Sequence, residues 1–244
     1  TEFPGWSGAK LSVALSQGTP WLLTVRADLA ARRGNFDALR GLRLTAAEGP
    51  DLAFKQMLRS AGLDPERDLE IVELPGAHEQ HVSFGVFAAE ALAQGTIDGF
   101  WANAMGAETA VASGIGKIHV DVRRGDDPGE VHFFTFAGLA TTDDFIAREP
   151  DAIDAAVRAI VKAQKALRAD PAIARDVGTR KFPPESIALI ATIVERDAPF
   201  YDPVISEAAV RRLNGFAQSI GHLPGPTPYD QVVATRCRAL WTDG

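Results

Sequence analysis

The chain has a single cysteine, Cys237, among its 244 residues. One cysteine excludes an internal disulfide and any metal site built from several cysteines. The five histidines are scattered, and none forms the HExxH pattern of zinc proteases. No apolar run approaches the roughly 20 residues that a membrane-spanning helix needs. The sequence therefore offers neither a disulfide framework, nor a cysteine-rich metal centre, nor a transmembrane helix.

Basic residues are also in the minority. The chain has 25 Lys and Arg against 32 Asp and Glu, which gives a formal charge of −7. This balance argues against a nucleic-acid surface, because phosphate contacts need clustered Lys and Arg. A hydrophobic content of 46% allows a sizeable core, in one large or two small domains. The sequence starts at Thr1 without an initiator Met, so we expect a processed, truncated or tagged chain whose start does not reveal its compartment.

The most informative stretch is Leu92–Met105, LAQGTIDGFWANAM. Its pattern predicts a helix that ends at Gly95, a short buried strand over Thr96–Phe100, and a new helix from Ala104. In open α/β sheets, ligands bind at the carboxyl ends of strands. Trp101 and Asn103 follow the predicted strand and offer a stacking face and an amide. The alternative is a core tryptophan and an asparagine that caps the helix Ala104–Ser113.

A second candidate site lies between a predicted strand, Gly41–Ala46, and a helix from about Leu52 to Ser60. The intervening turn carries Glu48, Gly49, Pro50 and Asp51. The free N–H groups of a helix N-terminus favour an anion, but Glu48 and Asp51 bring negative charge to the same end. The alternative is that either acid only caps the helix.

A third candidate is the polar turn between the predicted strands Leu11–Leu15 and Trp21–Val25. Its residues are Ser16, Gln17, Gly18 and Thr19. This turn is either a plain connector or a source of hydroxyl and backbone N–H groups for a ligand. His78 and His81 have a spacing found in metal sites, but no third ligand is near, and solvated loop histidines are the favoured interpretation.

Strand and helix patterns alternate from about Leu29 to Val122, which predicts a parallel sheet covered by helices. The later strands of this prediction are Leu69–Leu74, Ile115–Val122 and, beyond the series, Val131–Ala140. After Pro150 the pattern becomes helical. The predicted helices are Asp151–Ala169, a short one ending near Gly178, Ser186–Arg196, Ser206–Ile220 and Pro228–Trp241.

The order of four segments resembles a known family. They are LSQGTPWLLTVRADL (Leu15–Leu29), GLRLTAAEGPDLAFKQMLRSAGLDPERDLEIVEL (Gly41–Leu74), AAEALAQGTIDGFWAN (Ala88–Asn103) and VRAIVKAQKAL (Val157–Leu167). The chain is similar to solute-binding proteins of ABC importers of the nitrate/sulphonate/taurine type, which are related to the thiamine pyrimidine synthase fold. The most recognisable feature of that family is G-x-I-D-G, here Gly95–Gly99.

This resemblance implies an α/β fold of the type II periplasmic-binding-protein kind, with two lobes of parallel or mixed sheets covered by helices and a helical C-terminal tail. Residues 1–26 would be the remainder of lobe one and the first hinge strand. Residues 27–122 would be lobe two, and residues 123–244 the return hinge strand and the helical part of lobe one. Such proteins normally begin with a β-α-β-α-β segment of roughly 80–100 residues. This sequence does not show it, so we expect an exposed core on lobe one or a second chain that covers it.

The resemblance also implies a function. The chain would be a periplasmic or extracytoplasmic protein that captures a small organic ligand, anionic or aromatic, between its lobes for an ABC permease. It would use no cofactor, no metal and no catalytic residue, and would be a monomer if the N-terminal half is present. It would not bind nucleic acid, and would reach the membrane only through the permease. The implied ligand contacts are Ser16, Gln17, Gly18, Thr19, Glu48, Gly49, Pro50, Asp51, Trp101, Asn103, Met105, Phe134 and Thr135.

Glu48 and Asp51 depart from the Ser or Gly of many relatives. They disfavour a simple inorganic anion such as nitrate and leave room for polar or cationic groups. An enzyme of the same fold is an alternative, either pyrimidine-synthase-like or desulphinase-like. However, Cys237 lies in the predicted C-terminal helix, and the acids and histidines form no nucleophile–base pair. The effector domain of a transcription regulator is a further alternative, although no helix-turn-helix is visible.

Overall fold

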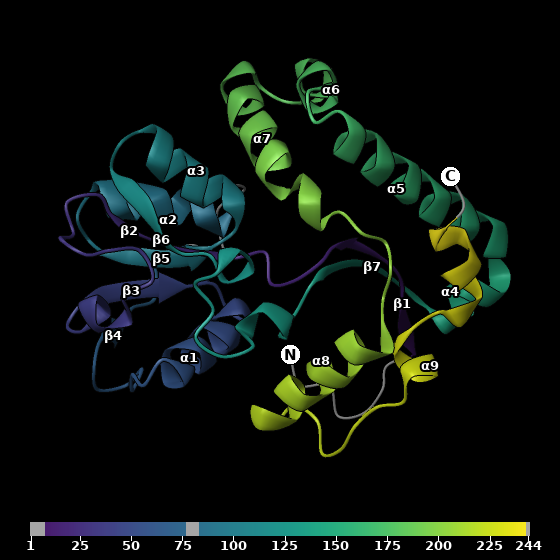
Figure 1. The fold of residues 1–244 in the computed structure, drawn as a ribbon, viewed down its shortest axis with the longest axis horizontal. Coiled ribbons are helices and arrows are strands. Elements are labelled where there is room, and N and C mark those ends of the chain that lie inside the picture. The colour runs from purple at the N-terminus through teal and green to yellow at the C-terminus, as the bar shows by residue number, and fades with distance from the viewer. Residues whose placement is uncertain (1–7, 77–82, 243–244) are drawn as a thin grey trace. The chain divides into compact units, whose positions relative to one another are not determined.

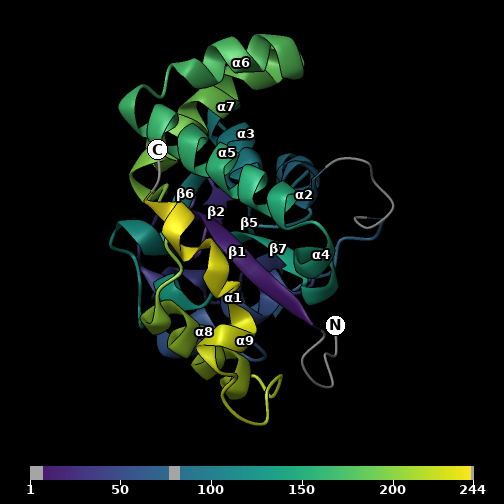
Figure 2. The ribbon, with the colours of Figure 1, turned by 90° about the vertical axis from the view of Figure 1, so that its right-hand side faces the viewer.

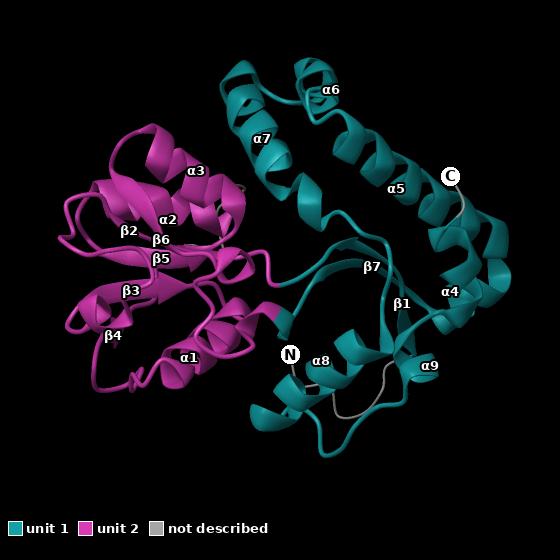
Figure 3. Cartoon of the chain, in the orientation of Figure 1, with its two compact units in different colours: residues 1–18, 133–244 teal, residues 19–132 magenta. Residues whose placement is uncertain are grey.

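The computed structural model describes residues 8–76 and 83–242, and the chain divides into two compact units (Figure 3). Unit 1 comprises residues 1–18 and 133–244, and unit 2 comprises residues 19–132. The chain therefore passes between the units after residues 18 and 132. The boundaries expected from the sequence lie after residues 26 and 122. They differ because the strand Leu22–Arg26 and the segment after Val122 both belong to the packing of unit 2.

Unit 2 contains a mixed five-stranded sheet with the order β4-β3-β5-β2-β6. Its strands are β2 (Leu22–Arg26), β3 (Arg43–Ala46), β4 (Glu70–Ile71), β5 (Gly99–Ala102) and β6 (Gly116–Val120). The predicted parallel pairing is confirmed for β3 with β4 and with β5. The prediction of parallel pairing covers Leu29–Val122. Strand β2 precedes that segment and lies antiparallel between β5 and β6. The early strand thus completes the middle of the sheet.

Helices cover both faces of this sheet (Figure 1). They are α1 (Pro50–Ser60), α2 (Phe84–Ala93) and α3 (Ala104–Ala112), with short 3-10 turns η1 (Phe36–Leu39) and η2 (Val122–Arg124). Side chains alternate along β5, so Phe100 joins the apolar cluster with α2, while Trp101 faces the other way and stacks on Phe54 of α1. Adjacent residues of one strand therefore anchor the helices of opposite faces.

Unit 1 is mostly helical. Strand β1 (Ala9–Ser16) pairs antiparallel with β7 (Ala137–Thr142). Beside them lie α4 (Asp143–Arg148), α5 (Pro150–Ala169), α6 (Ile173–Lys181), α7 (Pro184–Asp197), α8 (Glu207–Ser219) and α9 (Tyr229–Val232), and the 3-10 turns η3 (Val131–Phe133), which straddles the boundary with unit 2, η4 (Ala198–Phe200) and η5 (Thr235–Trp241). Figure 2 shows β1 crossing this unit beside α5 and η5. The core of the unit includes Val13, Val157, Ile205 and Trp241.

Several element predictions are confirmed and several are wrong. The long helix α5 and the helix α8 lie where the apolar periodicity put them. Thr142 caps α4 through its Oγ1, which accepts a hydrogen bond from the N–H of Phe145 at 3.1 Å. The predicted strand Val131–Ala140 is wrong in its first half, because a 3-10 turn comes first and β7 starts at Ala137. The predicted helix Pro228–Trp241 is interrupted. The N–H of Ala234 donates to the carbonyl of Leu11 on β1 at 2.9 Å, so the chain is extended there.

Candidate functional site

Three segments of unit 2 meet at one edge of its sheet. Strands β3 and β5 are parallel, and Ala46 pairs with Trp101 close to the end of both. Strand β2 is antiparallel to β5, so its first residue, Leu22, pairs with Ala102. Trp21, the turn Ala47–Pro50 and the segment Asn103–Met105 therefore lie at this edge, which we call the strand-end edge. Carboxyl ends of strands are where ligands bind in open α/β sheets, so this edge is the candidate site of unit 2.

The turn after β3 is shaped by its glycine and by Asp51. Gly49 has φ 90°, a backbone conformation that favours glycine, and Pro50 opens α1 directly after it. The N–H of Gly49 donates to Oδ1 of Asp51 at 3.0 Å, and Nζ of Lys55 lies 2.7 Å from Oδ2. The charge of Asp51 is therefore balanced inside the helix. Glu48 is exposed and forms no ion pair within the described part of the chain, so the turn presents one carboxylate to solvent.

Trp101 does not offer the expected stacking face. Its side chain is 0% exposed, and its ring stacks on Phe54 with centroids 5.9 Å apart and an interplanar angle of 17°. Trp21 approaches it edge-on at 6.4 Å. The expectation is corrected because β5 runs over Gly99–Ala102 rather than Thr96–Phe100. Trp101 is thus an interior position of the strand, and the core alternative is the right one.

Asn103 caps α3, as the alternative interpretation of this residue predicts. Its Oδ1 accepts a hydrogen bond from the N–H of Gly106 at 3.2 Å. The side chain is nevertheless exposed, and its amide nitrogen donates to no other residue that the structure describes. Capping and ligand binding use different atoms, so Asn103 can do both. Met105, the second residue of α3, is half-buried.

The first connecting segment is held by its own polar groups. The amide nitrogen of Gln17 donates to the carbonyls of Asp202 and Val204 in unit 1, at 2.9 and 2.8 Å. The hydroxyl of Thr19 is buried and donates to the carbonyl of Val131 in unit 2 at 2.6 Å. Both side chains therefore have structural roles.

The predicted contact set is divided between the units. Ser16, Gln17 and Gly18 belong to unit 1, as do Phe134 and Thr135. Phe134 stacks on Phe216 of α8 with centroids 4.4 Å apart and an interplanar angle of 11°, and Thr135 is half-buried. Within unit 2, the predicted contacts that lie together at the strand-end edge are Glu48, Gly49, Pro50, Asp51, Asn103 and Met105.

The part of the chain that the structure describes shows no cluster suited to catalysis or metal binding. Cys237 is buried in the core of unit 1, and this burial raises the pKa of its thiol, so the reactive thiolate is disfavoured. His78 and His81 lie outside the described residues. Within residues 8–76 and 83–242, no group of three or more His, Cys, Asp or Glu is placed to hold a metal ion. No helix in that part of the chain is both long and apolar enough to span a membrane.

Two residues near this edge are not in the predicted contact set. Trp21 is half-buried against Trp101, and only the pairing of β2 with β5 reveals its place. Asp121 follows β6, is 1% exposed, accepts the N–H of Arg123 at 3.1 Å and pairs with Arg124 at 2.7 Å. The polar residues that follow β6 in the sequence were a signal for this cluster. The partners of Asp121 are Arg123 and Arg124 of the same turn.

Comparisons with known proteins agree with this fold. The model of the NMT1-like family matches residues 37–180. The periplasmic sulfonate-binding protein SsuA from Methylobacillus flagellatus KT superposes with a TM-score of 0.65 and 20% identity, over 95% of this chain and 68% of its own. A ligand-binding component of an ABC-type import system from Staphylococcus aureus superposes with a TM-score of 0.69 and 13% identity, over 97% of this chain and 74% of its own. The desulfurization enzyme DSZB superposes with a TM-score of 0.59 and 17% identity, over 96% of this chain and 78% of its own. No curated protein matches the chain. The shared architecture is that of periplasmic binding proteins.

Proposed function

Since the chain belongs to the NMT1-like family, we propose that it is an extracytoplasmic solute-binding protein that captures a small organic ligand for an ABC importer. The observation that carries the proposal is the fold match over 95–97% of the chain to proteins that bind sulfonates or serve ABC import. The strand-end edge supports it, because this edge offers binding groups without a nucleophile–base pair.

In unit 2 we propose that the ligand contacts Glu48, Gly49, Asn103 and Met105. Glu48 supplies an exposed carboxylate, and Asn103 an amide nitrogen that can donate. Met105 supplies a polarizable apolar surface. A carboxylate beside the anion-favouring N-terminus of α1 disfavours a small inorganic anion and suits an organic molecule with several polar groups.

The first experiment is a thermal-shift screen of the full chain against nitrate, alkyl and aromatic sulfonates, carboxylates and amines. A ligand that binds only the folded state at 100 times its Kd adds about 2.7 kcal/mol of stability, which raises Tm by several degrees. Calorimetry with Glu48→Gln and Asn103→Asp then tests the edge. Asn103→Asp keeps the capping oxygen and removes the amide donor. Glu70→Gln, an exposed carboxylate at the opposite edge of the sheet, is the matched control.

We expect both edge variants to weaken binding by about tenfold or more, on the scale of one hydrogen bond to a charged group, and the control to leave it unchanged. If the control weakens binding equally, the effect comes from net charge and the site assignment fails. If no compound in the panel shifts Tm, the solute-binding proposal itself loses its support.

An enzyme is the second candidate, because DSZB has a similar fold. The buried Cys237 argues against a thiol nucleophile from this residue. Mass spectrometry of any ligand that raises Tm, before and after prolonged incubation with the protein, separates the two functions. Consumption of the ligand at a rate that scales with protein concentration would favour the enzyme.

A further inference from the structure

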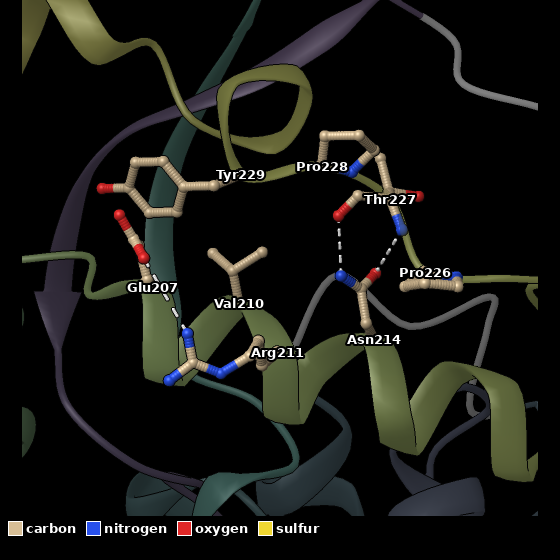
Figure 4. A pocket seen from close by; sticks show the side chains of 8 residues that line it. All are labelled: Glu207, Val210, Arg211, Asn214, Pro226, Thr227, Pro228 and Tyr229. Atoms are coloured by element: carbon tan, nitrogen blue, oxygen red, sulfur yellow. Dashed lines mark hydrogen bonds and ion pairs between the residues drawn. The ribbon is translucent and has the colours of Figure 1, made fainter.

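Unit 1 contains a cavity of about 290 Å³ between α8 and the loop that leads to α9 (Figure 4). It lies in a different unit from the strand-end edge. It is lined by Glu207, Val210, Arg211, Asn214, Pro226, Thr227, Pro228 and Tyr229. Its volume is near the lower end of the range for small-molecule pockets, so it suits a compact ligand.

The wall opposite α8 is rigidly built. Asn214 is 7% exposed, and its amide pairs with the backbone of Thr227 twice, donating to the carbonyl at 2.8 Å and accepting the N–H at 3.2 Å. Pro226 and Pro228 flank Thr227 and fix φ on both sides. The hydroxyl of Tyr229 donates to the carbonyl of Ile205 at 2.6 Å, which holds its ring in place. The cavity is therefore formed before any ligand arrives, which lowers the entropic cost of binding.

The charges lie at the rim, and the base is apolar. Val210 is 2% exposed and points into the cavity between Tyr229 and the prolines (Figure 4). Glu207 and Arg211 are one helical turn apart, with 3.8 Å between Oε2 and Nη1 and side chains 66% and 71% exposed. An exposed pair of this kind contributes only about 0.3–0.5 kcal/mol, so a ligand can open it at little cost.

We propose that this cavity binds a small zwitterion with an ammonium and a carboxylate on one carbon and an apolar substituent, that is, an apolar α-amino acid. The ammonium pairs with Glu207 and the carboxylate with Arg211. A negative and a positive group this close together complement the two charges of an α-amino acid when the two dipoles are antiparallel. The apolar substituent packs against the exposed Pro226 and Pro228 and the half-buried ring of Tyr229, from which water is then displaced.

Calorimetry on the full chain tests the proposal with leucine and three analogues. The analogues are 4-methylpentanoate, which lacks the ammonium, 3-methylbutylamine, which lacks the carboxylate, and glycine, which lacks the apolar group. Leucine is expected to bind, and each analogue to bind about tenfold or more weakly, on the scale of one charge-assisted hydrogen bond or one buried aliphatic side chain.

The variants Glu207→Gln and Arg211→Gln are each expected to weaken leucine binding by a similar factor. The matched controls are Asp144→Asn and Arg148→Gln on α4. This ion pair is also four residues apart in the sequence and similarly exposed, with 2.9 Å between Oδ2 and Nη2. Circular dichroism confirms that every variant is folded. The proposal is overturned if leucine does not bind, if a singly charged analogue binds as tightly, if both rim variants bind normally, or if the controls lose binding equally. Glu70→Gln, which removes an exposed carboxylate of unit 2 outside the strand-end edge, is expected to leave leucine binding unchanged.

Discussion

The crossing of α2 and α3 makes one sharp prediction. A Cβ added at Gly106 would lie 2.3 Å from the carbonyl oxygen of Gly85 and 2.4 Å from its carbonyl carbon. Both are backbone atoms, so the helices would have to separate. Overpacking of this kind costs about 1–3 kcal/mol, and the gain in helix propensity from Gly to Ala is at most about 1 kcal/mol. We therefore expect Gly106→Ala to lower the free energy of unfolding by about 1–2 kcal/mol.

Gly215→Ala is the control, and it is expected to change the free energy of unfolding in the opposite direction. Gly215 lies in the middle of α8, and a Cβ there would meet nothing within 4 Å. Gly215→Ala should raise stability by about 0.5–1 kcal/mol, because alanine loses less backbone entropy in a helix. Urea unfolding measures both, with hydrogen exchange of α2 and α8 peptides to assign each effect to its unit. If Gly106→Ala is neutral or stabilising, the helices do not approach as closely as described.

Three further predictions concern unit 2. Trp101→Ala should lower the free energy of unfolding of unit 2 by about 3–5 kcal/mol in urea denaturation, and Trp101→Phe should lower it by clearly less. Equal, small losses for the two variants would mean that the ring is not in the core. Asn103→Ala should cost about 0.5–2 kcal/mol, while Asn103→Asp keeps the cap, so equal losses would contradict the capping role. Burial lowers the pKa of His119, so the folded protein disfavours its charged form. Stability should therefore fall as pH drops below about 6.5, and a pH titration of His119→Gln should show less of this fall.

Local patterns predicted the elements with strong periodicity. The apolar spacing of Ile153, Val157, Ile160, Val161 and Leu167 predicts the 20-residue helix α5. Of these, Ile153, Val157 and Val161 are buried and the other two half-buried, while the buried Gln164 lies outside the apolar pattern. The strands β3 and β5 could likewise be placed within a few residues. Strand β2 was also placed within one residue, as Trp21–Val25, but its antiparallel insertion between β5 and β6 depends on pairing between distant segments that no local pattern records.

The error at Trp101 has a simple geometric origin. Side chains alternate along a strand, so the boundaries of the strand decide whether a residue ends it or lies inside it. The prediction stopped at Phe100, and the strand continues to Ala102. A shift of two residues thus turned an expected ligand contact into the centre of a core that includes Phe54 and Trp21.

The polar groups of the candidate site differ in how much binding capacity the fold leaves them. Both carboxylate oxygens of Asp51 already have partners, Gly49 and Lys55. Asn103 uses only its oxygen, and Glu48 forms no ion pair with a described residue. A hydrogen bond made within the fold must be broken before the same atom can serve a ligand, and the net gain then falls by the strength of the lost bond. Glu48 and Asn103 can bind without that loss, so specificity for a solute should depend more on these two residues than on Asp51.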